Sequence, residues 1–96
     1  MAINVSLVNF TDQGMRNIQD SPQRARAFRE LCKQHSVQVR EMLWTSGAYD
    51  MLVITEGPEE ALSTVLLAAA KLGNVRTQSL RGMDQETFQR VLERMS

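Results

Sequence analysis

Several residue types are scarce in this sequence of 96 residues, and each scarcity excludes a class of protein. Cys32 is the single cysteine, which excludes an intrachain disulfide and a cysteine-rich metal site. Eleven basic and eleven acidic residues cancel, so neither a nucleic-acid binder that depends on phosphate neutralisation nor a polybasic membrane anchor is expected. No apolar run approaches the roughly 18 residues that cross a bilayer, and the first ten residues lack the features of a signal peptide, which points to the cytoplasm.

Histidine is equally scarce, and this makes a metal or haem site within one chain unexpected. His35 is the single histidine, and it falls at the expected end of a helix, where the helix dipole favours a cation. A lone axial bond from His35 to haem is the remaining alternative. Cys32 lies on an apolar helix stripe with no paired base, which is typical of a small buried side chain rather than a nucleophile. We therefore expect no catalytic residue, no metal and no cofactor.

The residues that are present describe one small domain spanning residues 1–96. Hydrophobic residues make up 43 % and charged residues 23 % of the chain, which is ordinary for a globular domain. A chain of this length buries about 60–65 % of its unfolded surface. Its own core therefore gives modest stability, and association between subunits would add to it.

The spacing of apolar side chains separates the expected strands from the expected helices. Strands are expected at residues 3–10, 37–45, 48–56 and 75–83. Ser21 is expected to cap the first main helix, with Pro22 at its first helical position. Pro58 begins a second helix, and Asp84 caps a last helix near the C-terminus.

The resulting order is βαββαβ followed by an extra C-terminal helix. This is the split βαβ, or ferredoxin-like, arrangement of α+β proteins, with an antiparallel sheet whose central members are the first and third strands. The third strand carries a continuous apolar run at residues 51–54, as a strand covered on both faces should. Local pattern and topology therefore agree.

One face of this sheet needs a cover, because both main helices lie on the other face. Strand alternation predicts that the open face is apolar and aromatic. Its side chains would be Ser6, Val8, Phe10, Arg40, Met42 and Trp44, with either Leu52 and Ile54 or Met51 and Val53. Such a surface exceeds what a monomer usually exposes. A second subunit is the preferred cover, and the C-terminal helix and a ligand are the alternatives.

Tyr49 and Asp50 stand directly before the apolar run, in the stretch GAYDMLVITEGP. A phenol and a carboxylate at the mouth of a cavity would orient a ligand or transfer a proton. At neighbouring strand positions they point to opposite faces, which argues against joint action on one atom. The preferred interpretation is structural: Asp50 accepts backbone N–H bonds or pairs with Arg40 or Arg81, and Tyr49 packs against Trp44.

Three arginines occur in the stretch DSPQRARAFR, residues 20–29. These are Arg24, Arg26 and Arg29. A solvated helix face is the default interpretation. The alternative is an anion site, because a helix N-terminus with nearby arginines suits a carboxylate or a phosphate.

Four stretches together resemble the GYD-domain proteins, a family named after a glycine, a tyrosine and an aspartate at a strand entrance. The stretches are DSPQRA at residues 20–25, W-T-x-G at 44–47, GAYDMLVITEGP at 47–58 and LGNVRTQSLRGM at 72–83. Ala48 separates Gly47 from Tyr49, so the signature reads G-x-Y-D. The resemblance extends over about residues 5–92, and the pieces follow the family's order.

The resemblance implies a ferredoxin-like α+β fold similar to the dimeric α+β barrel proteins, in which two sheets meet face to face. Relatives of this wider fold include cofactor-free monooxygenases, haem-degrading enzymes, isomerases and ligand-sensing modules of transcription regulators. The fold alone does not choose among them.

We expect a homo-oligomeric small-molecule-binding or regulatory module that associates through its open sheet face, rather than an enzyme. The ligand-binding candidates are Phe10, Arg40, Trp44, Tyr49 and Asp50. One alternative is a small cofactor-independent enzyme of the monooxygenase or isomerase type, which would use Tyr49, Asp50 or Trp44 in a barrel cavity. The other is a structural assembly module without a ligand.

Overall fold

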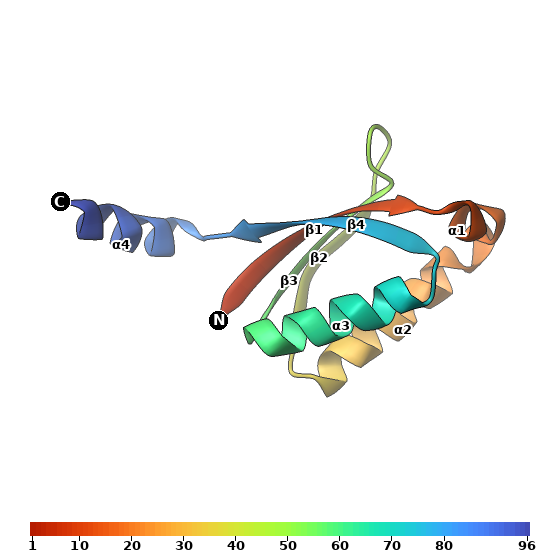
Figure 1. Ribbon diagram of the computed structural model, residues 1–96, viewed down its shortest axis with the longest axis horizontal. Helices are drawn as coiled ribbons and strands as arrows, with labels where there is room; N and C mark the ends of the chain where they lie inside the picture. Colours follow the sequence, from red (N-terminus) through yellow and green to blue (C-terminus); the bar gives the residue numbers. More distant parts are fainter.

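The computed structural model describes residues 1–96 as a four-stranded antiparallel sheet with two long helices on one face (Figure 1). The elements are β1 (Ala2–Phe10), α1 (Asp12–Arg16), the 3₁₀ helix η1 (Ile18–Asp20), α2 (Ser21–Gln34), β2 (Gln38–Trp44), β3 (Met51–Gly57), α3 (Glu59–Lys71), β4 (Val75–Gly82) and α4 (Gln85–Met95). The strand order is β2-β3-β1-β4, so β1 and β3 are central as predicted. The predicted ferredoxin-like α+β fold is confirmed.

Side-chain capping marks the start of α1 and of α4, whereas α2 and α3 begin without a side-chain cap. Thr11 caps α1 by accepting a hydrogen bond from the Gly14 N–H, and Asp84 caps α4 in the same way through the Thr87 N–H. The prediction that Ser21 caps α2 is wrong, because Ser21 is already helical, with φ −56° and ψ −44°. The 3₁₀ helix η1 is followed directly by α2, so the backbone is already helical before α2 begins.

The core between the helices and the sheet is divided into two small clusters. Cys32, Val37, Leu62 and Val65 form the first cluster, where the end of α2 meets the start of α3. The second cluster lies on the sheet itself and consists of Val8, Met51 and Val53. Phe28 and Val39 pack against both clusters and connect them. Only 12 of the 96 residues are buried, so the core is small.

The pairing register decides which side chains share a face of the sheet, because directly paired residues point the same way. Ser6 pairs with Val53 and Val8 with Met51, and all four lie beneath the helices. The open face carries the alternate residues. They are Ile3, Val5, Leu7, Leu43, Leu52, Ile54 and Leu80, which we call the open-face cluster.

The predicted membership of the open face is therefore wrong for β1 and for most of β2. Phe10 and Met42 line the space under the helices, and Trp44 pairs with the buried Met51. β1 is apolar on both faces, so alternation alone does not reveal which face receives the helices. In β2, a bulge between Val39 and Glu41 shifts the alternation, and Arg40 pairs with Glu56 beside the open face.

α4 does not return to cover the sheet. Figure 1 shows that it continues outward from the end of β4, with the C-terminus far from the other helices. The structure is accordingly elongated, with extents of 52 × 31 × 18 Å. The C-terminal helix is thus excluded as the cover of the open face in this conformation of the chain.

Candidate functional site

A cavity of about 460 Å³ lies between the helices and the sheet. Its walls come from residues 21–31 of α2, the second half of α3 with the loop that follows it, and the helix-facing side of the sheet. Fourteen of its 19 lining residues are hydrophobic. The largest apolar side chains that line it are Phe10, Phe28, Leu31, Met42, Met51, Leu66 and Leu72. This is the size and character of a site for a small, mainly apolar molecule.

Small side chains explain why this space stays open. α2 contributes Ala25 and Ala27 to the lining, and α3 contributes Ala68 and Ala69. The second core cluster lines the cavity from the sheet side, and these alanines face a space that no larger side chain fills. Sequence reasoning missed the cavity, although the run of alanines at residues 68–70 was the signal for it.

The mouth of the cavity is built by tight backbone contacts around Gly14, Arg24 and Asn74. A Cβ atom on Gly14 would lie 2.1 Å from the carbonyl oxygen of Asn74, so only glycine allows α1 to approach the loop before β4 this closely. Arg24 Nη1 donates to the Asn17 carbonyl at 2.9 Å, and Nη2 donates to the Gly14 carbonyl at 3.4 Å. The Arg24 side chain is thereby held at the opening.

Trp44 and Phe10, two predicted ligand-binding residues, lie on the cavity side of the sheet. Phe10 lines the cavity directly. The Trp44 indole Nε1 donates to the hydroxyl of Ser21, a buried lining residue, at 3.0 Å. Through this hydrogen bond, Trp44 connects the edge strand β2 to the start of α2 beside the cavity.

Tyr49 and Asp50 lie in the β2–β3 hairpin and do not line the cavity. Asp50 Oδ2 accepts the Phe10 N–H at 2.9 Å, and the Asp50 N–H donates to the Val8 carbonyl at 2.8 Å. The Tyr49 hydroxyl donates to Gln78 Oε1 at 2.6 Å.

The structural interpretation of Asp50 therefore matches the observed contacts, since its carboxylate accepts a backbone N–H. The predicted packing of Tyr49 against Trp44 is wrong. Tyr49 reaches Gln78, which shares the open face with Leu7, whereas Trp44 lies on the helix-facing side.

Arg40 is the second predicted ligand-binding residue, after Tyr49, beside the open face, where its Nη1 lies 3.5 Å from Glu56 Oε1. Around the open-face cluster, Arg40, Glu56, Arg76 and Gln78 form a polar border. An apolar centre with a polar border is the usual composition of a protein–protein interface.

Cys32 and His35 occupy the positions that the sequence predicted. Cys32 is fully buried on α2, and this burial raises the pKa of its thiol from 9.0 to about 11, although Arg29 opposes the effect. His35 forms the C-cap of α2 and is exposed. No group of three or more His, Cys, Asp and Glu side chains is arranged to hold a metal ion, and no helix is both long and apolar enough to cross a membrane.

Comparisons with solved structures show the fold. A crystal structure of MtbAldR superposes with a TM-score of 0.65 at 16 % identity, covering 88 % of this chain and 52 % of that chain. A feast or famine regulatory protein from M. tuberculosis, complexed with L-methionine, superposes with a TM-score of 0.64 at 17 % identity and the same coverage. This chain thus spans about half the length of each of these proteins.

Comparison at the level of sequence shows the family. No curated protein matches the chain significantly. The family model described as the GYD domain matches residues 5–92, which is nearly the whole chain and includes the cavity, the hairpin and most of α4. The chain therefore belongs to the GYD-domain family.

Proposed function

We propose that this protein is a homo-oligomeric module that binds a small molecule, with a regulatory role, and that the cavity beneath α2 and α3 is its binding site. The cavity of about 460 Å³ is the observation that carries this proposal. Its apolar walls supply the favourable burial, and the few polar groups at its mouth supply orientation. The fold shared with a regulatory protein complexed with L-methionine supports the same function class.

The proposed partner is a second copy of this chain, bound through the open-face cluster. Leu43 and Leu80 are 48 % and 53 % exposed, and they lie on the two outer strands of one continuous apolar surface. Two such faces are complementary to each other because both have an apolar centre and a polar border. Face-to-face packing of two sheets would give a dimeric α+β barrel.

The proposal gives different roles to Arg40, Tyr49 and Asp50. Arg40 and Tyr49 lie beside or over the open face and would contact the partner sheet, while Asp50 holds β1 against the hairpin. Phe10 and Trp44 are proposed as ligand-contacting and cavity-supporting residues, respectively.

Native mass spectrometry on gently purified protein tests both parts of the proposal at once. We expect a dimer or larger assembly that takes up octan-1-ol, a neutral apolar probe. The variant Ala69→Phe fills the cavity, so it should retain the assembly and lose the uptake. A monomer that takes up no octan-1-ol, with identical behaviour of the variant, would contradict the proposed function.

A further inference from the structure

The cavity opens into a second, polar depression, and Arg24 stands between the two. The polar depression is lined by Asn17, Asp20, Gln23, Arg24, Ala27 and Asn74. Arg24, Ala27 and Asn74 also line the apolar cavity, so the two spaces are continuous at these residues. The combined site is apolar inside and polar at its opening.

Arg24 has no carboxylate partner. The three ion pairs of the protein involve Arg40, Arg81 and Arg90. Two backbone carbonyls accept hydrogen bonds from the Arg24 guanidinium, which leaves further N–H groups of its five without a protein acceptor. Asp20 is the one carboxylate of the depression, and it lies beyond ion-pair distance from Arg24.

The helix itself adds to the positive potential at this point. Arg24 lies near the beginning of α2, where the dipole is positive. Asp20 at the N-cap opposes this potential in part, and no further acidic residue occupies the first turn. A half-buried cation in this place is unfavourable for the isolated helix, so a bound anion would relieve it. Arg26 and Arg29, from the same stretch of sequence, are exposed and do not line the cavity.

We propose that Arg24 binds the carboxylate of an amphipathic monocarboxylic acid whose apolar body fills the cavity. This inference rests on the proposed function, because it assigns a ligand class to the same site. A guanidinium presents parallel N–H groups that match the two oxygens of a carboxylate. The apolar walls exclude a strongly polar tail, and the cavity volume suits a short chain or a single ring.

Calorimetric titration with octanoate and octan-1-ol tests the assignment, since the two probes share an apolar chain and differ in charge at pH 7. The wild-type protein should bind octanoate about tenfold or more tightly than octan-1-ol. The variant Arg24→Gln should lose this preference while still binding octan-1-ol. Arg26→Gln, an exposed arginine of the same helix, should retain the preference.

The outcomes separate the inference from the proposed function. Equal binding of both probes by the wild-type protein would overturn the role of Arg24 and leave the cavity as a binding site. Binding of neither probe would overturn both. If loss of the bonds to Asn17 and Gly14 unfolds Arg24→Gln, Arg24→Lys provides the second variant. The lysine variant keeps the positive charge but lacks the planar, paired N–H donors of a guanidinium. Its affinity for octanoate should therefore fall, while its affinity for octan-1-ol stays the same.

Discussion

At the scale of single residues, Asp50 shows how a family signature can be structural. Its side-chain carboxylate and its backbone N–H bind the last residues of β1, so one residue fixes where the central strand ends and where β3 begins. The Asp50 carbonyl also accepts the Thr45 N–H at 2.9 Å, which closes the base of the hairpin. The three bonds connect β1, β2 and β3 at one point.

Asp50→Ala should lower the free energy of unfolding by about 1.5–3 kcal/mol, the usual contribution of a hydrogen bond to a charged acceptor. The Phe10 N–H would lose its partner, and β1 would be held less firmly. Asp50→Asn keeps an acceptor of the same shape and should cost less. Urea denaturation of the three proteins measures the difference, and equal midpoints would contradict the role assigned to this carboxylate.

Cys32 makes the stability of the protein depend on pH in the alkaline range. The pKa of its thiol is about 11 in the folded chain because burial disfavours the thiolate, and 9.0 is the unperturbed value. The unfolded chain therefore releases this proton first, and stability falls as pH rises from about 9 to about 11, by at most about 1.4 kcal/mol per pH unit.

Thermal unfolding between pH 8 and pH 11 measures this decline in stability. Cys32→Ala removes the thiol, so its stability should decline less over the same range. Since every other ionisable side chain is the same in both proteins, the difference between the two curves reports Cys32 alone. Parallel curves would show that the Cys32 thiol does not contribute to the pH dependence of stability.

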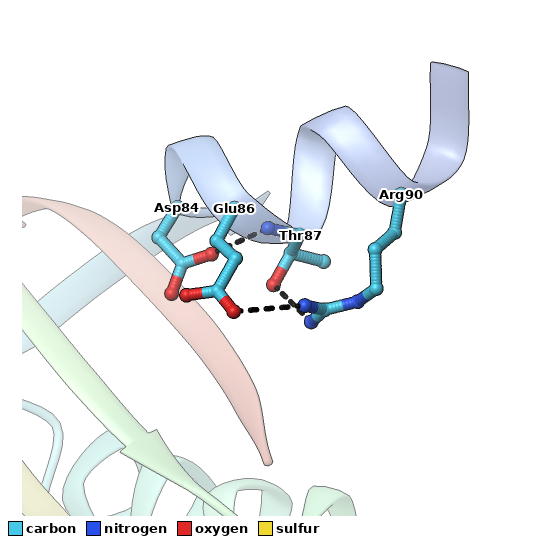
Figure 2. A network of polar contacts seen from close by, with 4 residues as sticks. All are labelled: Asp84, Glu86, Thr87 and Arg90. Atoms are coloured by element: carbon cyan, nitrogen blue, oxygen red, sulfur yellow. Dashed lines mark hydrogen bonds and ion pairs between the residues drawn. The ribbon is translucent and has the colours of Figure 1, made fainter. Parts of the chain in front are cut away.

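At the scale of secondary-structure elements, α4 is stabilised by its own polar face and lacks a partner for its apolar face. Asp84 accepts the Thr87 N–H at 2.8 Å, and Arg90 donates to both Glu86 and Thr87 (Figure 2). Thr87 lowers the pKa of the Asp84 carboxyl, chiefly through its side chain and next through its backbone N–H. The opposite face carries apolar residues that remain exposed. They are Phe88, Val91, Leu92 and Met95.

A second copy of the chain is the partner that we expect for this apolar face. A helix of 11 residues is marginally stable alone in water. Two residues, Met83 and Asp84, connect α4 to β4, so in the conformation of Figure 1 the helix extends away from its own sheet. The double variant Phe88→Glu and Leu92→Glu should therefore weaken self-association and reduce helix content.

Sedimentation and circular dichroism measure these two effects of the α4 variant. Gln89→Glu alters an exposed polar position of the same helix and serves as the control, because it leaves the apolar face intact. An unchanged oligomer in the double variant would show that α4 is not part of the interface.

The elements of this fold could be predicted from the sequence to a greater extent than the site could. Strand order and helix positions follow from the period of the apolar residues and from caps such as Asp84, all of which are local signals. The face occupied by Phe10 and Trp44 could not be predicted, because β1 is apolar on both faces and β2 contains a bulge. Alanines of α2 and α3 leave the cavity open, but only tertiary packing brings the two helices together, which the period of apolar residues does not reveal.

At the scale of the whole molecule, the open face has consequences for assembly. Leu80→Glu places a charge in the open-face cluster at a position that is half exposed, so folding should tolerate it. A dimer built through this face would bury the charge, and we expect the variant to be monomeric. Light scattering coupled to size-exclusion chromatography measures the change.

Leu67→Glu is the matched control for this experiment. Leu67 is 70 % exposed on α3, away from the open face, so its variant should retain the wild-type assembly. If both leucine variants behave like the wild type, self-association does not use the open face.

The strand order also determines how this sheet can grow. Its two edges are β2 and β4, and each exposes unpaired backbone groups to which a further strand could add. β2 carries Arg40 and Glu41 at a bulge, and β4 carries Arg76 and Arg81. Charged side chains and bulges are the devices that block edge-to-edge pairing. These features disfavour fibril growth along the edges, so we expect copies of the chain to meet through a face of the sheet rather than through an edge.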